Sequence, residues 1–345
     1  MRYTVNFRVL SFILLLLFVF PLSSCKEERE PRVNNRVFYD HFDTVSVFYD
    51  YTGMENAEFS ALAKSVESSI AHYHRLFDAY NEYDGINNIA TINRLAGSGA
   101  VKTDRAIVEL LLFAEEMYVK TGGKVNYAMG AVTYLWKTLP AMKEGARIPT
   151  EEELSEAGRH ISPGSVIINE EDSTVEILDS ALRLDLGAIA KGYTAELIKS
   201  ELVALGYTGL VLDMGGNLCA VGAKPSGEGW KSGIRNPLYS EDGEEPYSRT
   251  VTLLDDSLVT SGVYERYHTV DGKKYHHIID TETLMPENRY LSVSVQTSHS
   301  GVADSLSTAI FNMDFDAAKA FIKEFSESLE VTFVFSDGSC EVVAK

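Results

Sequence analysis

Cysteine is scarce in this chain of 345 residues, which contains only Cys25, Cys219 and Cys340. Three cysteines form at most one disulfide, so a disulfide-stabilised scaffold is excluded, and their spacing matches no zinc site. Positive charge is also in short supply, because 31 Lys and Arg stand against 50 Asp and Glu and give a net charge of −19. Such a surface repels nucleic-acid phosphates and anionic lipid. A ligand that carries phosphate therefore requires a local device, such as a metal ion or a helix N-terminus.

A long hydrophobic run is missing from the chain except near its beginning. The run at residues 9–20 follows Arg2 and Arg8 and is too short to span a bilayer comfortably, which is typical of a signal peptide. The next segment, Leu22-Ser23-Ser24-Cys25, resembles the lipobox of bacterial lipoproteins, in which the cysteine becomes the lipid-bearing first residue. An ordinary signal peptide that ends near a cysteine is the alternative.

This N-terminal pattern predicts where the protein works. We expect residues 1–24 to be removed, Cys25 to be lipidated, and the charged residues 25–35 to tether the rest of the chain. The protein is then a membrane lipoprotein on the extracytoplasmic side. Residues 36–345 contain no repeat and no low-complexity linker, so they are predicted to form one domain.

The domain is predicted to belong to the α+β class. Apolar residues recur every three to four positions over 59–77 and again over 107–117, which predicts two amphipathic helices. Thr150 and Glu153 form a capping-box pattern that begins a third, short helix. Helices and strands are segregated along the chain, which favours a mixed or antiparallel sheet with flanking helices over a doubly wound sheet.

The second half of the domain is rich in short β-branched runs, which predict strands. These runs lie at 165–169, 174–179, 182–186, 208–213, 249–254 and 291–296. Two helices interrupt them, near 188–205 and 303–327. A final hairpin is expected over 331–343, with its turn at Asp337-Gly338.

One strand-to-helix join is a candidate phosphate site. The run at 182–186 is followed by a turn at Gly187 and by a helix whose first turn contains Lys191. Amides at a helix N-terminus point at an anion, and a lysine there adds a full positive charge. The segment matches neither the phosphate loop of nucleotide triphosphatases nor the dinucleotide-binding glycine pattern, and in isolation an ordinary structural join is the more common interpretation.

Asp304 and Thr308 are a candidate pair of metal ligands. They stand four residues apart and therefore share one face of a helix, where a carboxylate and a hydroxyl are suitable oxygen ligands for Mg²⁺. An acidic residue favoured by the helix dipole beside a solvent-facing threonine is the alternative. His276 and His277 are adjacent in an expected strand and face opposite sides, so they are not predicted to chelate one metal together.

Other polar positions are interpreted as structural. His72 and His74 are two residues apart on a helix and are predicted to be surface residues. Gly215 and Gly216 follow a strand, where either a plain turn or a close ligand approach is expected. We expect Cys219 and Cys340 to be thiols in the core rather than a bridge.

Taken together, several segments resemble the ApbE family, the FAD:protein FMN transferases. The segments, in family order, are FDTVSVFYDY, FDAYNEYDGINNIATIN, GGKVNYAMGAVTYLW, LDLGAIAKGY, DMGGN, TSGVYERY, YHHIIDTETLMP and ADSLSTAIF. The resemblance extends over about residues 36–335. It implies a single α+β domain of the kind called a T-fold, and many family members are lipoproteins.

The resemblance also implies a reaction and a set of site residues. The family cleaves FAD at its pyrophosphate with Mg²⁺, transfers FMN to a threonine hydroxyl of a partner protein and releases AMP. It implies that Asp304, Thr308 and the carbonyl of Ala188 hold the metal, and that His277 is the general base on the acceptor hydroxyl. It places Lys191 at the diphosphate. Residues matched to family FAD contacts are Phe42, Tyr80, Asn126, Asp185, Lys191, His277 and Ile278.

The chain departs from the family pattern at some positions. Asn126 and Ala128 stand where many members have an aspartate and a threonine, and Leu284 stands where others have a glycine. These changes put the flavin-side contacts and the acceptor preference in question more than the metal site. Hydrolysis of FAD to FMN and AMP, or flavin binding without catalysis, are the alternative functions. The expected partners are FAD and an acceptor protein of an extracytoplasmic electron-transfer system, with the chain acting as a monomer.

Overall fold

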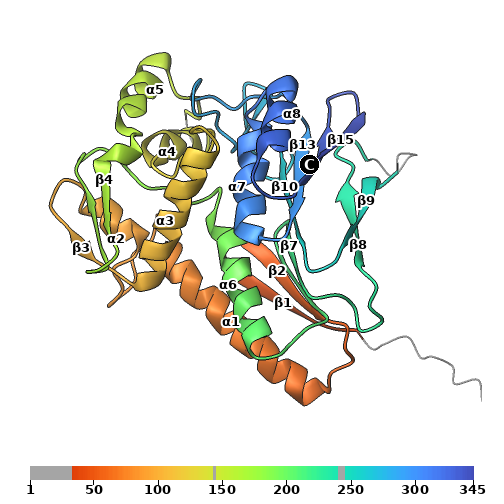
Figure 1. Ribbon diagram of the computed structural model, residues 1–345. Helices are drawn as coiled ribbons and strands as arrows, with labels where there is room; N and C mark the ends of the chain where they lie inside the picture. The colour runs from red at the N-terminus through yellow and green to blue at the C-terminus, as the bar shows by residue number, and fades with distance from the viewer. Residues whose placement is uncertain (1–32, 143–144, 240–244) are drawn as a thin grey trace, which may run out of the picture. The chain divides into compact units, whose positions relative to one another are not determined.

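The computed structural model describes residues 33–345, except 143–144 and 240–244 (Figure 1). Cys25 and the expected signal peptide lie outside these residues. None of the helices in the described part is both long and apolar enough to cross a membrane. The helices are α1 (Asn56–Phe77), α2 (Ile89–Arg94), α3 (Arg105–Lys120), α4 (Gly130–Thr138), α5 (Glu151–Ala157), α6 (Ala190–Ala204), α7 (Ser300–Phe311) and α8 (Phe315–Glu324).

An eight-stranded antiparallel sheet is the centre of the fold. Its strands, in spatial order, are β1 (Asn34–His41), β2 (Thr44–Asp50), β6 (Leu210–Met214), β7 (Asn217–Val221), β10 (Ser257–Gly262), β13 (Ser292–Thr297), β14 (Glu330–Val334) and β15 (Cys340–Ala344). The strand β1 thus begins slightly before the expected domain boundary at residue 36. The antiparallel pairing confirms the predicted α+β class.

The two faces of this sheet are covered by different layers. Alternate residues of β6 point to opposite faces, so Leu212 packs with α1 and α6 while Val211 packs toward a separate hairpin. That hairpin is β8 (Trp230–Arg235) with β9 (Tyr247–Leu253), and in Figure 1 it lies on the side away from the helices. Because both faces are covered, the central strands are apolar on both sides.

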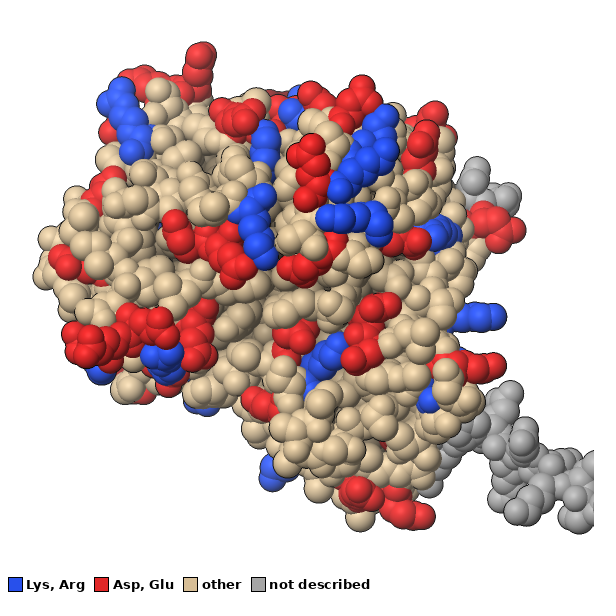
Figure 2. Space-filling model, viewed as in Figure 1, with Lys and Arg blue, Asp and Glu red and all other residues tan. Residues whose placement is uncertain are grey.

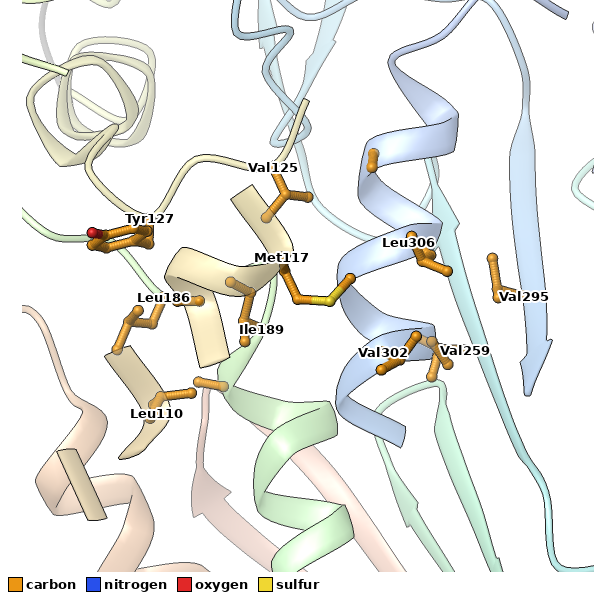
Figure 3. Packing of buried hydrophobic residues seen from close by; sticks show 14 of the residues in the cluster. Leu110, Met117, Val125, Tyr127, Leu186, Ile189, Val259, Val295, Val302 and Leu306 are labelled. Atoms are coloured by element: carbon orange, nitrogen blue, oxygen red, sulfur yellow. The ribbon is translucent and has the colours of Figure 1, made fainter. Parts of the chain in front are cut away.

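The largest core cluster lies between the sheet and the helices. In Figure 3, Val302 and Leu306 of α7 point toward Val259 and Val295 of the sheet, while Met117 of α3 approaches α7 from the other side. The helix α7 is therefore enclosed, and all of its residues except Thr308 are buried. Any polar side chain on this helix is consequently placed inside the protein.

Three smaller sheets complete the structure. One is built from β3 (Val101–Lys102), β5 (Thr174–Ile177) and β4 (Val166–Asn169), in that spatial order, and packs near α2 and α3. The others are the hairpin β8–β9 and a second hairpin, β11 (Tyr267–Val270) with β12 (Lys273–His276). Short 3₁₀ turns at Gly158–His160 and Pro163–Ser165 connect α5 to β4.

Several local predictions are confirmed. The helices expected over 59–77 and 107–117 are α1 and α3. The capping box of α5 is complete, because the Thr150 side chain accepts from the Glu153 amide and the Glu153 side chain accepts from the Thr150 amide. The last hairpin, β14–β15, turns at Gly338, whose φ of 83° suits glycine.

Two predicted elements are wrong. Residues 182–186 form no regular strand, because their backbone bonds go elsewhere: the Leu184 amide donates to the Asn93 side chain, and the Asp185 amide donates to the Tyr127 carbonyl. Only an isolated bridge joins Arg183 to Met129. The single helix expected over 303–327 is two helices, α7 and α8, because the backbone becomes extended at Asp314.

Cys219 and Cys340 are free thiols, as expected, but differ in environment. Cys219 is buried in β7, where desolvation raises the pKa of its thiol to about 12. Cys340 is exposed on β15, so the expectation that it lies in the core is wrong. It begins the outermost strand of the sheet, where one side of the strand has no neighbour to cover it.

Because α7 is enclosed, a substitution that leaves a cavity beside it should lower the stability of the protein. We expect Leu306→Ala to lower the free energy of unfolding by about 2–5 kcal/mol, since Leu306 is fully buried between α3 and the sheet. The control is Leu205→Ala at the end of α6, which is 70% exposed and should change stability by less than about 0.5 kcal/mol. Urea denaturation of both variants would measure the difference, and equal shifts would contradict the packing described for α7.

Candidate functional site

The helices α6 and α7 touch at Gly192, and this contact organises the site. A Cβ atom at Gly192 would lie 2.5 Å from Cβ of Asp304 and would overlap the Ser300 carbonyl oxygen. The Gly192 amide donates a hydrogen bond to Oδ2 of Asp304, at 2.9 Å. This amide belongs to the first turn of α6, where amides have no acceptor within the helix, and the Asp304 carboxyl supplies one.

Asp304 is a buried carboxylate with a single nearby cation. Its surface is 4% exposed, and burial raises the pKa of its carboxyl, while Lys191 opposes that shift. The two form an ion pair in which Lys191 Nζ lies 3.6 Å from Oδ1 of Asp304. Lys191 and Asp304, which were both predicted as site residues, thus lie together at the first turn of α6. Further positive charge beside Asp304 would stabilise the ionised form of its carboxyl.

Thr308 marks the opening of the site. It is the one residue of α7 that is not buried, one turn along from Asp304 on the same face. Its Oγ1 lies 3.4 Å from Oγ of Ser261 at the end of β10, and Ser261 in turn hydrogen-bonds Ser307 at 2.9 Å. Because Asp304 is buried and Thr308 is half-buried, the alternative of a helix-dipole carboxylate beside a solvent-facing threonine does not describe them.

These groups fit a small, hard cation. Asp304 offers a carboxylate, Thr308 a hydroxyl and Ala188 a carbonyl, which are the oxygen ligands that Mg²⁺ prefers. No three His, Cys, Asp or Glu side chains gather into a metal site within the described residues. A cation here would therefore rest on one carboxylate with neutral oxygens, an arrangement in which Mg²⁺ keeps several waters or takes substrate oxygens.

Asp185 connects three segments near this site. Its Oδ2 accepts from the Thr133 hydroxyl at 2.5 Å and from the Tyr80 hydroxyl at 3.2 Å, and its Oδ1 accepts from the Gly187 amide at 2.8 Å. The Lys137 ammonium lies over the Tyr80 ring, 3.3 Å from its centre. Asp185 therefore fixes the loop that leads to Lys191 and orients the exposed Tyr80 ring.

His277 carries an available ring nitrogen. Its Nδ1 lies 3.1 Å from the carbonyl oxygen of Arg266, which only accepts, so Nδ1 holds the proton and Nε2 of the neutral ring has the lone pair. His277 is partly exposed, but the surrounding protein excludes water from much of the ring. This desolvation lowers the pKa of the imidazole. The charges of Arg266 and Lys191 act in the same direction. His277 is thus neutral and able to accept a proton near pH 7.

His276 has a different role. Its Nε2 donates to the Glu287 carbonyl at 3.0 Å and its Nδ1 accepts from the Ile278 amide at 3.2 Å, so both ring nitrogens are occupied. The prediction that the two histidines face opposite sides is confirmed, since His276 is buried and His277 is exposed. The strand β12 ends at His276, which places His277 just beyond the strand rather than inside it.

Phe42 lies in the turn between β1 and β2, with a φ of 54°. Its amide donates to Nδ1 of His74 at 3.2 Å, and its carbonyl accepts from the Arg266 guanidinium at 3.3 Å. The expectation that His74 is a surface residue is therefore wrong: it is half-buried, and desolvation lowers its pKa. Tyr83 completes the chain, with its hydroxyl 3.3 Å from Nε2 of His74. Arg266 thus links the Phe42 turn to His277.

Other residues at or near the predicted FAD contacts form hydrogen bonds, pack or pair with residues of the protein itself. Asn126 donates from Nδ2 to the Ile161 carbonyl at 2.9 Å and accepts the Ala128 amide at 2.8 Å. Ile278 is 4% exposed, so its side chain belongs to the core. Asp280 is fully buried, paired with Arg289 at 3.1 Å, and shapes the following turn.

Leu284 occupies a left-handed conformation that favours glycine. Its φ is 58°, at the position where the family resemblance leads one to expect glycine. The carbonyl of Leu284 accepts from the indole of Trp136 at 2.9 Å, and its side chain packs with the cluster around α4 and α5. This departure therefore preserves the turn while filling it with an apolar side chain.

Sequence reasoning missed some residues of the site. Gly192, Ser261, Arg266 and Thr133 all contact predicted site residues, yet none stands in a spacing that indicates chemistry. The available signals were that all four lie in the segments that resemble the family and that Gly192 is a glycine inside a predicted helix, which indicates either destabilisation or a close approach.

Comparison with known proteins identifies similar sequences. The model of the ApbE family matches residues 43–333. A protein named FAD:protein FMN transferase from Treponema pallidum (strain Nichols) is 35% identical over 263 residues, covering 72% of this chain and 71% of that protein. Another of the same name, from Klebsiella pneumoniae (strain 342), is 28% identical over 268 residues, covering 75% of this chain and 81% of that protein.

Solved structures share the fold. The crystal structure of the ApbE protein from Thermotoga maritima has a TM-score of 0.79 at 23% identity, covering 90% of this chain and 97% of that one. The apo flavinyl transferase ApbE of Pseudomonas stutzeri has a TM-score of 0.73 at 22% identity, covering 91% and 94% respectively. This likeness confirms the expected single α+β domain.

The contact at Gly192 predicts a steric effect. Gly192→Ala should destabilise the protein by about 1–3 kcal/mol, because the added methyl must push α6 away from α7. The matched control is Gly164→Ala, whose Cβ would meet only the Ser162 hydroxyl at an ordinary 3.5 Å. Urea denaturation of the two variants is the measurement. If Gly192→Ala unfolds at the same midpoint as the control, the helices do not approach as described.

Proposed function

This chain belongs to the ApbE family, and we propose that it is a Mg²⁺-dependent FAD:protein FMN transferase that modifies a threonine of an acceptor protein. Its relatives in Treponema and Klebsiella carry the name FAD:protein FMN transferase. The observations that carry the proposal are a buried Asp304 paired with Lys191 and an imidazole, His277, whose Nε2 is available and whose pKa is lowered by burial. Storing a flavin requires no such base.

The metal belongs beside Asp304, Thr308 and the Ala188 carbonyl. When bound there, Mg²⁺ supplies positive charge to the diphosphate of FAD. Burial raises the pKa of the Asp304 carboxyl. A divalent cation beside this carboxyl would therefore stabilise its ionised form. The Gly192 amide fixes one carboxylate oxygen and leaves the orientation of the other to Lys191 and the ion.

His277 and Lys191 have different roles in the transfer. His277 accepts the proton of the acceptor hydroxyl at Nε2, and the oxygen attacks the phosphorus of the FMN half of FAD. A phosphorus–oxygen bond to the threonine forms as the bond to the AMP phosphate breaks, and AMP leaves with the electron pair. Lys191 stabilises the negative charge that develops on the diphosphate. Water in place of the hydroxyl would give free FMN and AMP on the same residues.

The flavin side of FAD is assigned to the exposed region around Phe42 and Tyr80. Asp185 orients the Tyr80 ring, and His74 with Arg266 holds the Phe42 turn. Figure 2 shows Asp and Glu scattered over the visible face, with Lys and Arg among them and uncharged residues between. On such an acidic protein, Lys191 and a metal provide the local positive charge that a diphosphate requires.

The N-terminal segment supports a location for this activity. The segment Leu22-Ser23-Ser24-Cys25 is consistent with lipidation at Cys25 and removal of residues 1–24. The strand β1 begins at Asn34, so the charged residues after Cys25 serve as a short tether. The enzyme then acts as an extracytoplasmic membrane lipoprotein, as a single chain, on a protein of an electron-transfer system.

Transfer is tested by the mass of the acceptor. Purified protein with FAD, Mg²⁺ and an acceptor that bears a Ser-Gly-Ala-Thr segment should add one FMN to the threonine and release AMP. Asp304→Asn should abolish the Mg²⁺-dependent reaction while retaining FAD binding, since Phe42 and Tyr80 lie on other segments. Free FMN and AMP with an unmodified acceptor would indicate hydrolysis, and intact bound FAD would indicate a binding protein.

The role of His277 predicts both a rate and a pH profile. His277→Ala should slow transfer by about 10²–10⁴-fold without loss of FAD binding. Because only the neutral ring accepts a proton and its pKa is lowered, kcat/KM should hold as the pH falls through the ordinary histidine value of about 6.5 and decline only below it. A profile of kcat/KM against pH for the wild type measures this. A decline centred at or above that value, or normal transfer by the variant, would assign the proton to another group.

A further inference from the structure

The turn between β1 and β2 has an unfavourable backbone conformation. His41 pairs with Thr44, so the strands are joined by a two-residue turn. The turn residues are Phe42 and Asp43, with φ values of 54° and 51°. A two-residue turn of this type needs a positive φ at both positions and favours Asn-Gly or Asp-Gly. A bulky residue such as Phe42 rarely adopts a positive φ, so the surrounding structure must hold it there.

The hairpin β11–β12 has a turn of the same type with favourable residues. Val270 pairs with Lys273, and the residues between them have φ values of 49° and 78°. These residues are Asp271-Gly272, a pair that forms such a turn by local preference. A pair of this kind would connect β1 to β2 at lower cost than Phe42 does. The presence of Phe42 therefore points to a role for its side chain beyond connecting two strands.

Arg266 holds the unfavourable turn from a distant segment of the chain. Its Nη2 donates to the carbonyl oxygen of Asp43 at 3.0 Å and to that of Phe42 at 3.3 Å. From the other side, Nδ1 of His74 accepts from the Phe42 amide at 3.2 Å. Both carbonyls and one amide of the turn are thus bound by side chains from elsewhere, which is the support that a strained backbone requires.

The backbone of the same arginine fixes the proposed base. The Arg266 carbonyl accepts from the His277 amide at 3.2 Å and from Nδ1 of the His277 ring at 3.1 Å. The register of the hairpin explains this contact, because Tyr267 pairs with His276, one position further along each strand. The carbonyl orients the ring and so directs its Nε2. Arg266 therefore contacts the base through its backbone and the Phe42 turn through its guanidinium.

We propose that Arg266 is a positioning residue that holds the Phe42 turn and His277 in a fixed relation, so that bound FAD and the base are aligned with each other. The inference rests on the proposed function, in which Phe42 lies on the flavin side and His277 accepts the proton of the acceptor. Alignment of this kind matters for the rate, since a misplacement of about 1 Å between reacting groups slows a reaction by about 10²-fold.

A double-mutant cycle on FAD affinity tests whether Arg266 acts through the turn. Arg266→Met removes both bonds from Nη2 and keeps the backbone carbonyl, so it should weaken FAD binding by about tenfold, the effect of one or two hydrogen bonds. Phe42→Asn removes the ring but tolerates a positive φ. In the Phe42→Asn protein, Arg266→Met should change FAD affinity little, because the ring that it positions is gone.

Titration of each full-length variant with FAD, followed by flavin fluorescence, gives the four affinities. The side chain of Arg266 is exposed, so its replacement should leave the fold intact. If the losses from the two substitutions add, Arg266 acts on FAD independently of Phe42, and the positioning role is overturned.

Transfer kinetics at saturating FAD test the alignment of the base. Arg266→Met should lower kcat by about 10–100-fold. It should also move the decline of kcat/KM to higher pH, because the guanidinium charge helps to lower the pKa of His277 while Lys191 and His276 are unchanged. Arg266→Lys keeps a cation and a donor at the position, so it should recover most of both effects.

An arginine on another part of the sheet provides the control. Arg249 of β9 contacts the Thr332 hydroxyl at 2.9 Å and the Glu330 carboxylate at 2.8 Å, so Arg249→Met also removes two side-chain contacts. It should change neither FAD affinity nor the pH profile. Equal effects of Arg249→Met and Arg266→Met would reduce the result to a general loss of stability and overturn the positioning role.

The outcomes separate this proposal from the proposed function. If the wild type transfers FMN and Arg266→Met shows the same kcat and pH profile, the positioning role is overturned and the proposed function stands. If the wild type transfers no FMN to the acceptor, the proposed function fails, and the alignment of FAD with a base fails with it.

Discussion

The close contact between α6 and α7 at Gly192 is the constraint on which the site depends. Without a side chain at this position, the backbone of α6 comes near enough for its amide to bond Asp304. That bond gives a first-turn amide of α6 its acceptor, and Lys191 of the same turn pairs with the same carboxylate. The helix N-terminus, the lysine and the carboxylate therefore form one unit, and a larger residue at Gly192 would separate all of them.

Because α7 is enclosed by other elements, the carboxylate of this unit is a buried charge. Strands β10 and β13 cover one side of the helix and α3 approaches the other, so Asp304 is buried in a largely apolar core. A lone buried charge is costly, and here the Gly192 amide and the Lys191 ammonium of α6 lie against it. Thr308, one turn further along α7, is the residue of that helix that is only half-buried.

Features that depend on local sequence were predictable, whereas features that depend on tertiary pairing were not. The periodicity of α1 and α3, the capping box at Thr150 and the turn at Gly338 are encoded within a few residues. Residues 182–186 have the composition of a strand, but the partners of their amides are a distant side chain and a loop carbonyl. His74 likewise appears exposed by helical spacing, and only the β1–β2 turn that packs on it makes it half-buried. Helical spacing indicated Asp304 and Thr308 and the resemblance to a family supplied the role of His277, while the contacts of Arg266 with His277 and the Phe42 turn required the structure.

The distribution of the site along the chain bears on how the protein folds. Phe42 and Thr308 stand near opposite ends of the described residues, and Lys191 and His277 come from segments between them. Contacts of such large sequence separation form slowly, because much of the chain must be ordered before they can be made. No short stretch of the described residues contains Lys191, His277 and Asp304 together, so we expect the proposed site to form only after these distant segments have packed. A truncated chain that lacks one of these segments is then expected to lack the complete site.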